Sequence, residues 1–134
     1  MLIAILKKLK QERGQAMVEM ALIAPILMLL LFGTIEFGRI FNSYLEVTNA
    51  AREGARAGVV GATDSSIVTA VKNSAVLLDG DFLTINVNPG ADYRNRGTAL
   101  NVTVYYPVEI YTPIIRNITG NPFIVRGSAT MRME

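Results

Sequence analysis

The feature that most constrains this chain is a run of sixteen residues without a charge, Met20–Ile35. With Glu19 and Glu36 accepted inside it, the apolar stretch extends from Ala16 to about Phe41. A helix rises 1.5 Å per residue, so this stretch is long enough to cross the ~30 Å hydrocarbon layer of a membrane. A helix in a soluble core would show a polar face at regular helical spacing, and none occurs within the run. The sequence therefore predicts one membrane-spanning helix.

Charge is distributed unevenly along the chain. The 134 residues carry a formal net charge of +2, whereas residues 1–14 hold four basic residues and one acidic residue, a net charge of +3. In the ten residues after the run the only basic residue is Arg39. Because Lys and Arg favour the cytoplasmic side, this asymmetry places residues 1–14 in the cytoplasm and the chain after about residue 40 on the far side. The remainder lacks the basic excess that nucleic-acid binding requires, so we expect no nucleic-acid partner.

The absence of two residue types limits the chemistry that is available. The chain has no Cys and no His, which excludes a disulfide framework, thiolate or imidazole metal ligands, and Ser-His or Cys-His nucleophile pairs. No clustered carboxylates and no phosphate-binding loop replace them. We therefore expect a protein that is not an enzyme and that has no metal and no cofactor.

The sequence just before the apolar run has a distinctive order. A short basic leader ends at Gly14, Gln15 follows, and a lone carboxylate, Glu19, stands five residues after the glycine at the start of the apolar helix. This order resembles the processing site of type IV pilin precursors. The resemblance implies that a prepilin peptidase cuts after Gly14 on the cytoplasmic side, so that Gln15 becomes the N-terminus. It also implies that Glu19 pairs with the N-terminus of a neighbouring subunit during assembly.

Three segments narrow the resemblance: RGQAMVEMALIAPIL from Arg13, GTIEFGR at 33–39 and AAREGARAG at 50–58. Together they resemble the TadE-like family, the minor pilins or pseudopilins of tight-adherence (Tad/Flp) pilus systems. Met20 stands where the major Flp pilins usually carry Tyr, and the chain is much longer than a major pilin, which favours the minor class. The implied partners are a prepilin peptidase, other pilin and pseudopilin subunits, the inner-membrane assembly platform and membrane lipid.

The helical pattern continues beyond the membrane. It divides the chain into a cytoplasmic prepilin-type leader, a transmembrane half of one long helix, a periplasmic helical stem and an exported α+β domain, at residues 1–14, 15–41, 42–62 and 63–134. Pro25 removes one backbone donor and should kink the inner half of the helix. Ala50, Gly54 and Gly58 form a ladder of small residues that allows close packing, either on the protein's own sheet or on the helix of another subunit.

The exported part reads as an α+β domain. Asp64 is the expected N-cap of a second helix, whose apolar stripe reaches Leu78 before Asp79 and Gly80 end it. Alternating apolar and polar residues predict antiparallel strands, the first two as a hairpin, at 83–88, 100–106 and 123–132. A polar loop covers 88–97, and Thr112-Pro113 can begin a short helix through about Ile118. Because about 75 residues build only a small core, the outer half of the long helix should supply the missing apolar face, as in a pilin-like fold.

These observations predict a minor pilin or pseudopilin, a structural assembly component of a Tad/Flp-type pilus or secretion system that serves cell adhesion. It would be a single-pass protein of the bacterial inner membrane with a cytoplasmic N-terminus, held there or assembled into a surface pilus. The alternative is a single-pass membrane-anchored extracytoplasmic binding or sensor domain that never enters a filament. Gly14 and Glu19 separate the two hypotheses, because a plain anchor has no use for either residue.

Overall fold

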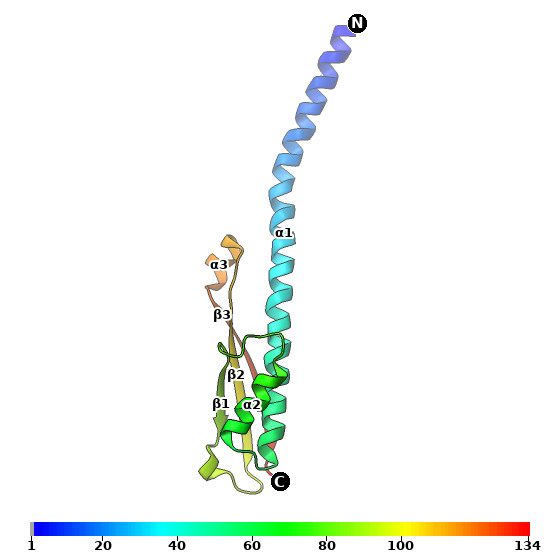
Figure 1. The fold of residues 1–134 in the computed structure, drawn as a ribbon. Coiled ribbons are helices and arrows are strands. Elements are labelled where there is room, and N and C mark those ends of the chain that lie inside the picture. The colour runs from blue at the N-terminus through cyan, green and yellow to red at the C-terminus, as the bar shows by residue number, and fades with distance from the viewer. Residues whose placement is uncertain (1) are drawn as a thin grey trace. The chain divides into compact units, whose positions relative to one another are not determined.

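A computed structural model describes residues 2–134, with side chains described from Gly14 onward. Helix α1, Leu2–Val59, is continuous (Figure 1) and ends where the sequence predicts, next to Gly61, which has a positive φ of 92°. The chain forms two compact units, residues 1–35 and residues 36–134. The helix passes through Pro25 without interruption. The kink expected at this proline stays a prediction.

The segment of α1 in the first unit presents its apolar side chains to the surroundings. Met17, Leu22, Met28 and Leu30 are each more than half exposed, and the other large apolar residues between 17 and 35 are also exposed. This part of α1 is long and apolar enough to cross a membrane. The segment therefore fits a single-pass membrane anchor, since such a surface is stable in lipid and not in water.

The second unit is an α+β fold, as predicted. It contains α2, β1, η1, β2, α3 and β3, which cover Asp64–Ser74, Thr84–Asn88, Ala91–Tyr93, Ala99–Val108, Pro113–Thr119 and Phe123–Arg132. The strands form one antiparallel sheet in the order β1-β2-β3. Val87 pairs with Val102, and Val104 pairs with Gly127. The predicted hairpin and the C-terminal strand are therefore confirmed.

Two details of α2 differ from the expectation. The N-cap is Thr63, whose Oγ1 accepts a hydrogen bond from the Ser66 backbone N–H at 3.3 Å, and Asp64 is the first helical residue. The helix ends at Ser74 and does not reach Leu78. The Ser74 hydroxyl donates to the Val71 carbonyl at 3.0 Å, a local bond that competes with continuation of the helix. A short 3-10 turn, η1, also occupies part of the loop that was expected to be irregular.

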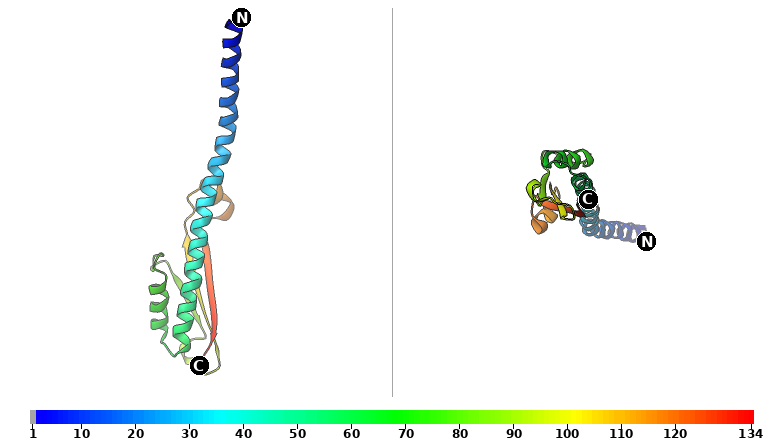
Figure 2. Two further views of the ribbon diagram at one scale, coloured as in Figure 1. Left: turned by 90° about the vertical axis from the view of Figure 1, so that its right-hand side faces the viewer. Right: turned by 90° about the horizontal axis from the view of Figure 1, so that it is seen from below.

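The core joins the outer part of α1 to α2 and the sheet (Figure 2). Ala50, Ala51 and Ala55 of α1 are fully buried with Val71 of α2 and Val102 of β2. Small residues on the helix let larger side chains of the sheet and α2 fill the space between the layers. The long helix thus supplies the apolar face that the small domain lacks, as expected.

Strand β3 lies against the backbone of α1 at Gly127. A Cβ at this position would lie 2.5 Å from the backbone C and O of Val47 and the backbone N of Thr48. Only a residue without a side chain fits at that distance. Gly127 was not among the residues predicted to matter, although an isolated glycine within a strand pattern often marks a close backbone approach.

Candidate functional sites along the long helix

The first candidate site is the predicted processing region at the start of the apolar segment. Gln15 Nε2 donates a hydrogen bond to Glu19 Oε1 at 3.1 Å, one helical turn away, and both residues are exposed. A Cβ placed on Gly14 would meet no atom within 4 Å. Glycine within a helix is less favourable than alanine by about 0.5–1 kcal/mol. Packing within this chain therefore gives no reason for glycine at position 14.

The small-residue ladder lies inside the folded unit. A Cβ on Gly54 would lie 2.5 Å from Val71 Cγ2 and 3.2 Å from Val102 Cγ1. A Cβ on Gly58 would collide with the side chain of Leu100. Of the two alternatives for the ladder, the structure places these two glycines, with the fully buried Ala50, against α2 and the sheet of the same chain.

A different face of α1 carries large apolar side chains outward. Phe37 is 68% exposed, Phe41 is 51% exposed, and Tyr44 and Leu45 are also about half exposed. These positions are separated by four, seven and eight residues, so they form one stripe on the helix. The rings of Phe37 and Phe41 stack with their centroids 6.2 Å apart. This aromatic stripe, residues 37–45, lies in the folded unit. It was not predicted from the sequence, because Phe37 and Phe41 fall within the expected transmembrane range and were assigned to the membrane.

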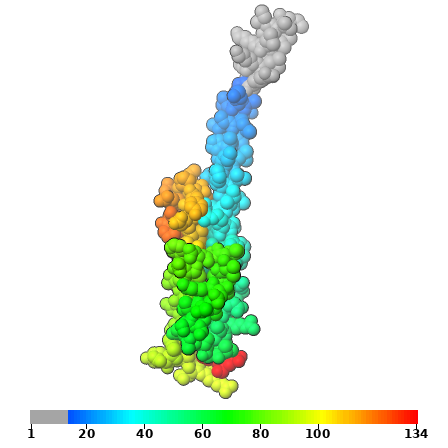
Figure 3. All heavy atoms as spheres, viewed as in Figure 1, coloured from blue at the N-terminus to red at the C-terminus, as the bar shows by residue number. Residues whose placement is uncertain are grey.

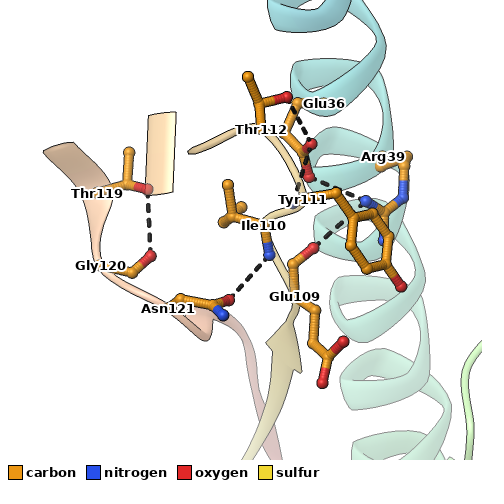
Figure 4. Close-up of polar contacts among 9 residues, drawn as sticks. All are labelled: Glu36, Arg39, Glu109, Ile110, Tyr111, Thr112, Thr119, Gly120 and Asn121. Atoms are coloured by element: carbon orange, nitrogen blue, oxygen red, sulfur yellow. Dashed lines mark hydrogen bonds and ion pairs between the residues drawn. The ribbon is translucent and has the colours of Figure 1, made fainter. Parts of the chain in front are cut away.

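A buried carboxylate fastens α1 to the segment after β2 (Figure 4). Glu36 is only 4% exposed. Its Oε1 lies 2.9 Å from Arg39 Nη1, and its Oε2 accepts hydrogen bonds from Tyr111 N and Thr112 Oγ1, both at 3.3 Å. Burial of a carboxylate requires such partners, because an unpaired buried charge is strongly unfavourable. The Glu36 cluster thus holds the chain at residues 111–112 against the helix.

Arg39 completes this cluster. Its Nη1 also donates to the Glu109 carbonyl at 3.3 Å, and its guanidinium lies 4.4 Å from the centroid of the Tyr111 ring. In the sequence, Glu36 was recognised only as a flank of the apolar run. The available signal was the GTIEFGR segment, in which an acid and a base stand three residues apart at the end of a membrane span.

A pocket of about 540 Å³ lies beside the cluster. Its lining includes Arg39 and Ser43 of α1, Phe82, Tyr106 and Glu109. The two charged residues have opposite signs, and Arg39 is already paired with Glu36. Among the residues whose side chains are described, no three His, Cys, Asp or Glu residues come together as a metal site would require. The pocket therefore has no concentration of charge of one sign.

In the comparison with known proteins, the model of one family matches part of the chain. The model of the TadE-like protein family matches residues 14–56. The matched TadE-like segment begins at Gly14 and includes Glu19, the Glu36–Arg39 pair, the aromatic stripe and most of the small-residue ladder. No curated protein and no solved structure matches the chain.

The match confirms the resemblance to the TadE-like family seen in the sequence, over residues 14–56 of the 134. The sheet of the second unit lies outside the matched TadE-like segment.

Proposed function

We propose that the protein is a minor pilin or pseudopilin, a structural subunit that packs its long helix against other pilin-type subunits of a Tad/Flp-type pilus. The observation that carries this proposal is the aromatic stripe of residues 37–45. A protein that only anchors a domain needs apolar surface within the bilayer. This stripe begins in the expected transmembrane range but extends beyond it to Tyr44 and Leu45, on the folded unit. Contiguous exposed apolar surface of this kind is typical of an interaction site.

The processing region supports the same proposal. Cleavage after Gly14 by a prepilin peptidase would create an ammonium group on Gln15, one helical turn from the Glu19 carboxylate. In the uncut helix the Gln15 amide already reaches this carboxylate. A carboxylate in the membrane is unfavourable by about 2–3 kcal/mol, and a nearby ammonium, in the same chain or in a neighbour, would offset much of that. In this scheme Gly14, which packing within the chain does not require, is the cleavage site, and Glu19 is the partner of the new ammonium group.

In this proposal the leader faces the cytoplasm and the folded unit lies beyond the inner membrane, because the basic residues precede the span. The inner-membrane assembly platform would receive the subunit from the bilayer and join it to its neighbours. The alternative function, a membrane-anchored binding or sensor domain, requires no partner along the stripe.

Photo-crosslinking from the stripe tests the proposal. Phe41 is replaced by the photoreactive analogue p-benzoylphenylalanine in cells that express the whole pilus system, and adducts are identified by mass spectrometry. We expect adducts with other pilin or pseudopilin subunits. Asn73, which is exposed on α2, is the matched control position and should give few such adducts. Absence of subunit adducts at position 41 would favour the sensor alternative.

A further inference from the structure

The tip of the folded unit, residues 109–122, lies between two strands that end together. Strand β2 ends at Val108, which pairs with Phe123 at the start of β3. The connecting segment contains α3 and extends beyond this edge of the sheet, at the end where Glu36 lies (Figure 4). Figure 3 shows the segment in orange, at the opposite end of the unit from the 89–97 loop.

The tip is apolar and faces outward. Ile118 is 80% exposed, and Ile114, one helical turn earlier, and Tyr111 are also more than half exposed. From Ile110 to Val125 the sequence contains one charged residue, Arg116, which is exposed. Such an apolar surface is unfavourable in water, so we expect another molecule to cover it.

The level of the tip relative to a bilayer follows from Glu36. Residues 16–35 cover about 30 Å as a helix, which matches the hydrocarbon thickness of a membrane. Counted from Ala16, Glu36 is the next residue and stands at the outer edge of the hydrocarbon. The expected transmembrane range of 15–41 is longer than the hydrocarbon requires, so residues 36–41 would lie at headgroup height. Glu36 Oε2 binds Tyr111 N and Thr112 Oγ1, and α3 begins at Pro113, immediately afterwards. The hydrogen bonds to Glu36 thus hold the start of α3 at the height of the membrane surface.

We propose that the α3 tip is a second membrane contact, which lies in the headgroup region of the outer leaflet while the subunit is still in the bilayer. This inference rests on the membrane anchoring in the proposed function. The chemistry fits a lipid surface: Ile114 and Ile118 would enter the acyl boundary, Tyr111 would lie at headgroup height, and Arg116 would reach lipid phosphates.

The contact is restricted to the interfacial region. The tip includes non-helical backbone at residues 109–112 and 120–122, and such backbone needs water or headgroups to satisfy its hydrogen bonds. The folded unit would then be attached to the membrane at two places, α1 and the tip. Extraction of the subunit into a filament would require release of the tip as well as of the helix.

The absence of native Cys allows a direct test in the full chain. Single-cysteine variants Ile118→Cys, Tyr93→Cys and Leu27→Cys are labelled with an environment-sensitive fluorophore and reconstituted in vesicles of phosphatidylethanolamine and phosphatidylglycerol. Quenching by aqueous iodide is compared with quenching by lipids that carry a nitroxide near the headgroup. Tyr93, in η1, is the matched control because it is 74% exposed at the opposite end of the sheet.

We expect the label at position 118 to be several-fold less sensitive to iodide than the label at position 93, and to be quenched by the nitroxide lipids. Adding Ile114→Glu to the labelled Ile118→Cys chain should restore iodide sensitivity, whereas Ile114→Leu should not. If position 118 is as open to iodide as position 93 while position 27 is embedded, the tip does not contact lipid and this inference is wrong. If position 118 becomes shielded only when other pilus subunits are added, the partner is a protein and the lipid contact is again excluded. If position 27 itself is open to iodide, the membrane anchoring and hence the proposed function fail.

Discussion

The approach of β3 to α1 makes Gly127 the most informative position for a test of the fold. In Gly127→Ala the new methyl group would lie 2.5 Å from backbone atoms of Val47 and Thr48. Backbone atoms of a helix cannot rotate away as a side chain can, so α1 and the sheet would have to separate. Overpacking of this kind destabilises a protein by about 1–3 kcal/mol. Alanine also restricts the unfolded chain more than glycine does, which stabilises the folded state by about 0.4–1 kcal/mol. We therefore expect a net loss of about 1–2 kcal/mol of unfolding free energy.

For a folded unit of about 100 residues this loss lowers the melting temperature by about 10 °C. All five tyrosines of the chain lie in residues 36–134, so the tyrosine band in near-UV circular dichroism of the full chain in detergent micelles reports on this unit. The matched control is Gly90→Ala, because a Cβ at Gly90 meets nothing within 4 Å and its φ of −61° suits any residue. The control should melt at or slightly above the parent temperature. If Gly127→Ala also melts at the parent temperature, the close packing of β3 on α1 is refuted.

Three further predictions concern the ends of the apolar segment. Glu36→Ala should lower the unfolding free energy of the folded unit, measured by chemical denaturation, by about 2 kcal/mol, because it leaves Tyr111 N without its acceptor. Glu36→Gln should lower it less, since the amide oxygen can still accept that hydrogen bond. Equal losses in the two variants would contradict the hydrogen-bonding role. Gly14→Val should leave residues 1–14 attached in cells that contain the prepilin peptidase, as intact-mass measurement would show, and a native protein that still begins at Met1 would contradict processing. Glu19→Gln and Glu19→Ala should preserve membrane insertion and cleavage but reduce co-purification with other pilin subunits. Unchanged co-purification would refute the pairing role and indicate that Glu19 is an ordinary acidic residue at the start of a helix.

The sequence by itself determined the features that arise from local patterns. The charge-free run required a long apolar helix, because any other backbone at membrane depth leaves its hydrogen bonds unsatisfied. Period-two alternation was sufficient to locate β1, β2 and β3, since successive residues of a strand point to opposite faces. Helix ends were less certain because they depend on single local bonds, such as those of Thr63 and Ser74 that displaced both ends of α2.

Tertiary structure decided whatever depends on residues far apart in the chain. Glu36 and Tyr111 are 75 positions apart, and no local pattern indicates that the carboxylate of one accepts the backbone N–H of the other. The same holds for Gly127 and Val47, whose approach exists only after the sheet has formed and docked. The ladder glycines illustrate the limit most clearly. Their spacing indicated a close contact, but only the packed positions of Val71 and Val102 showed which neighbours make it. A small residue allows another element to approach closely but does not determine which element does so.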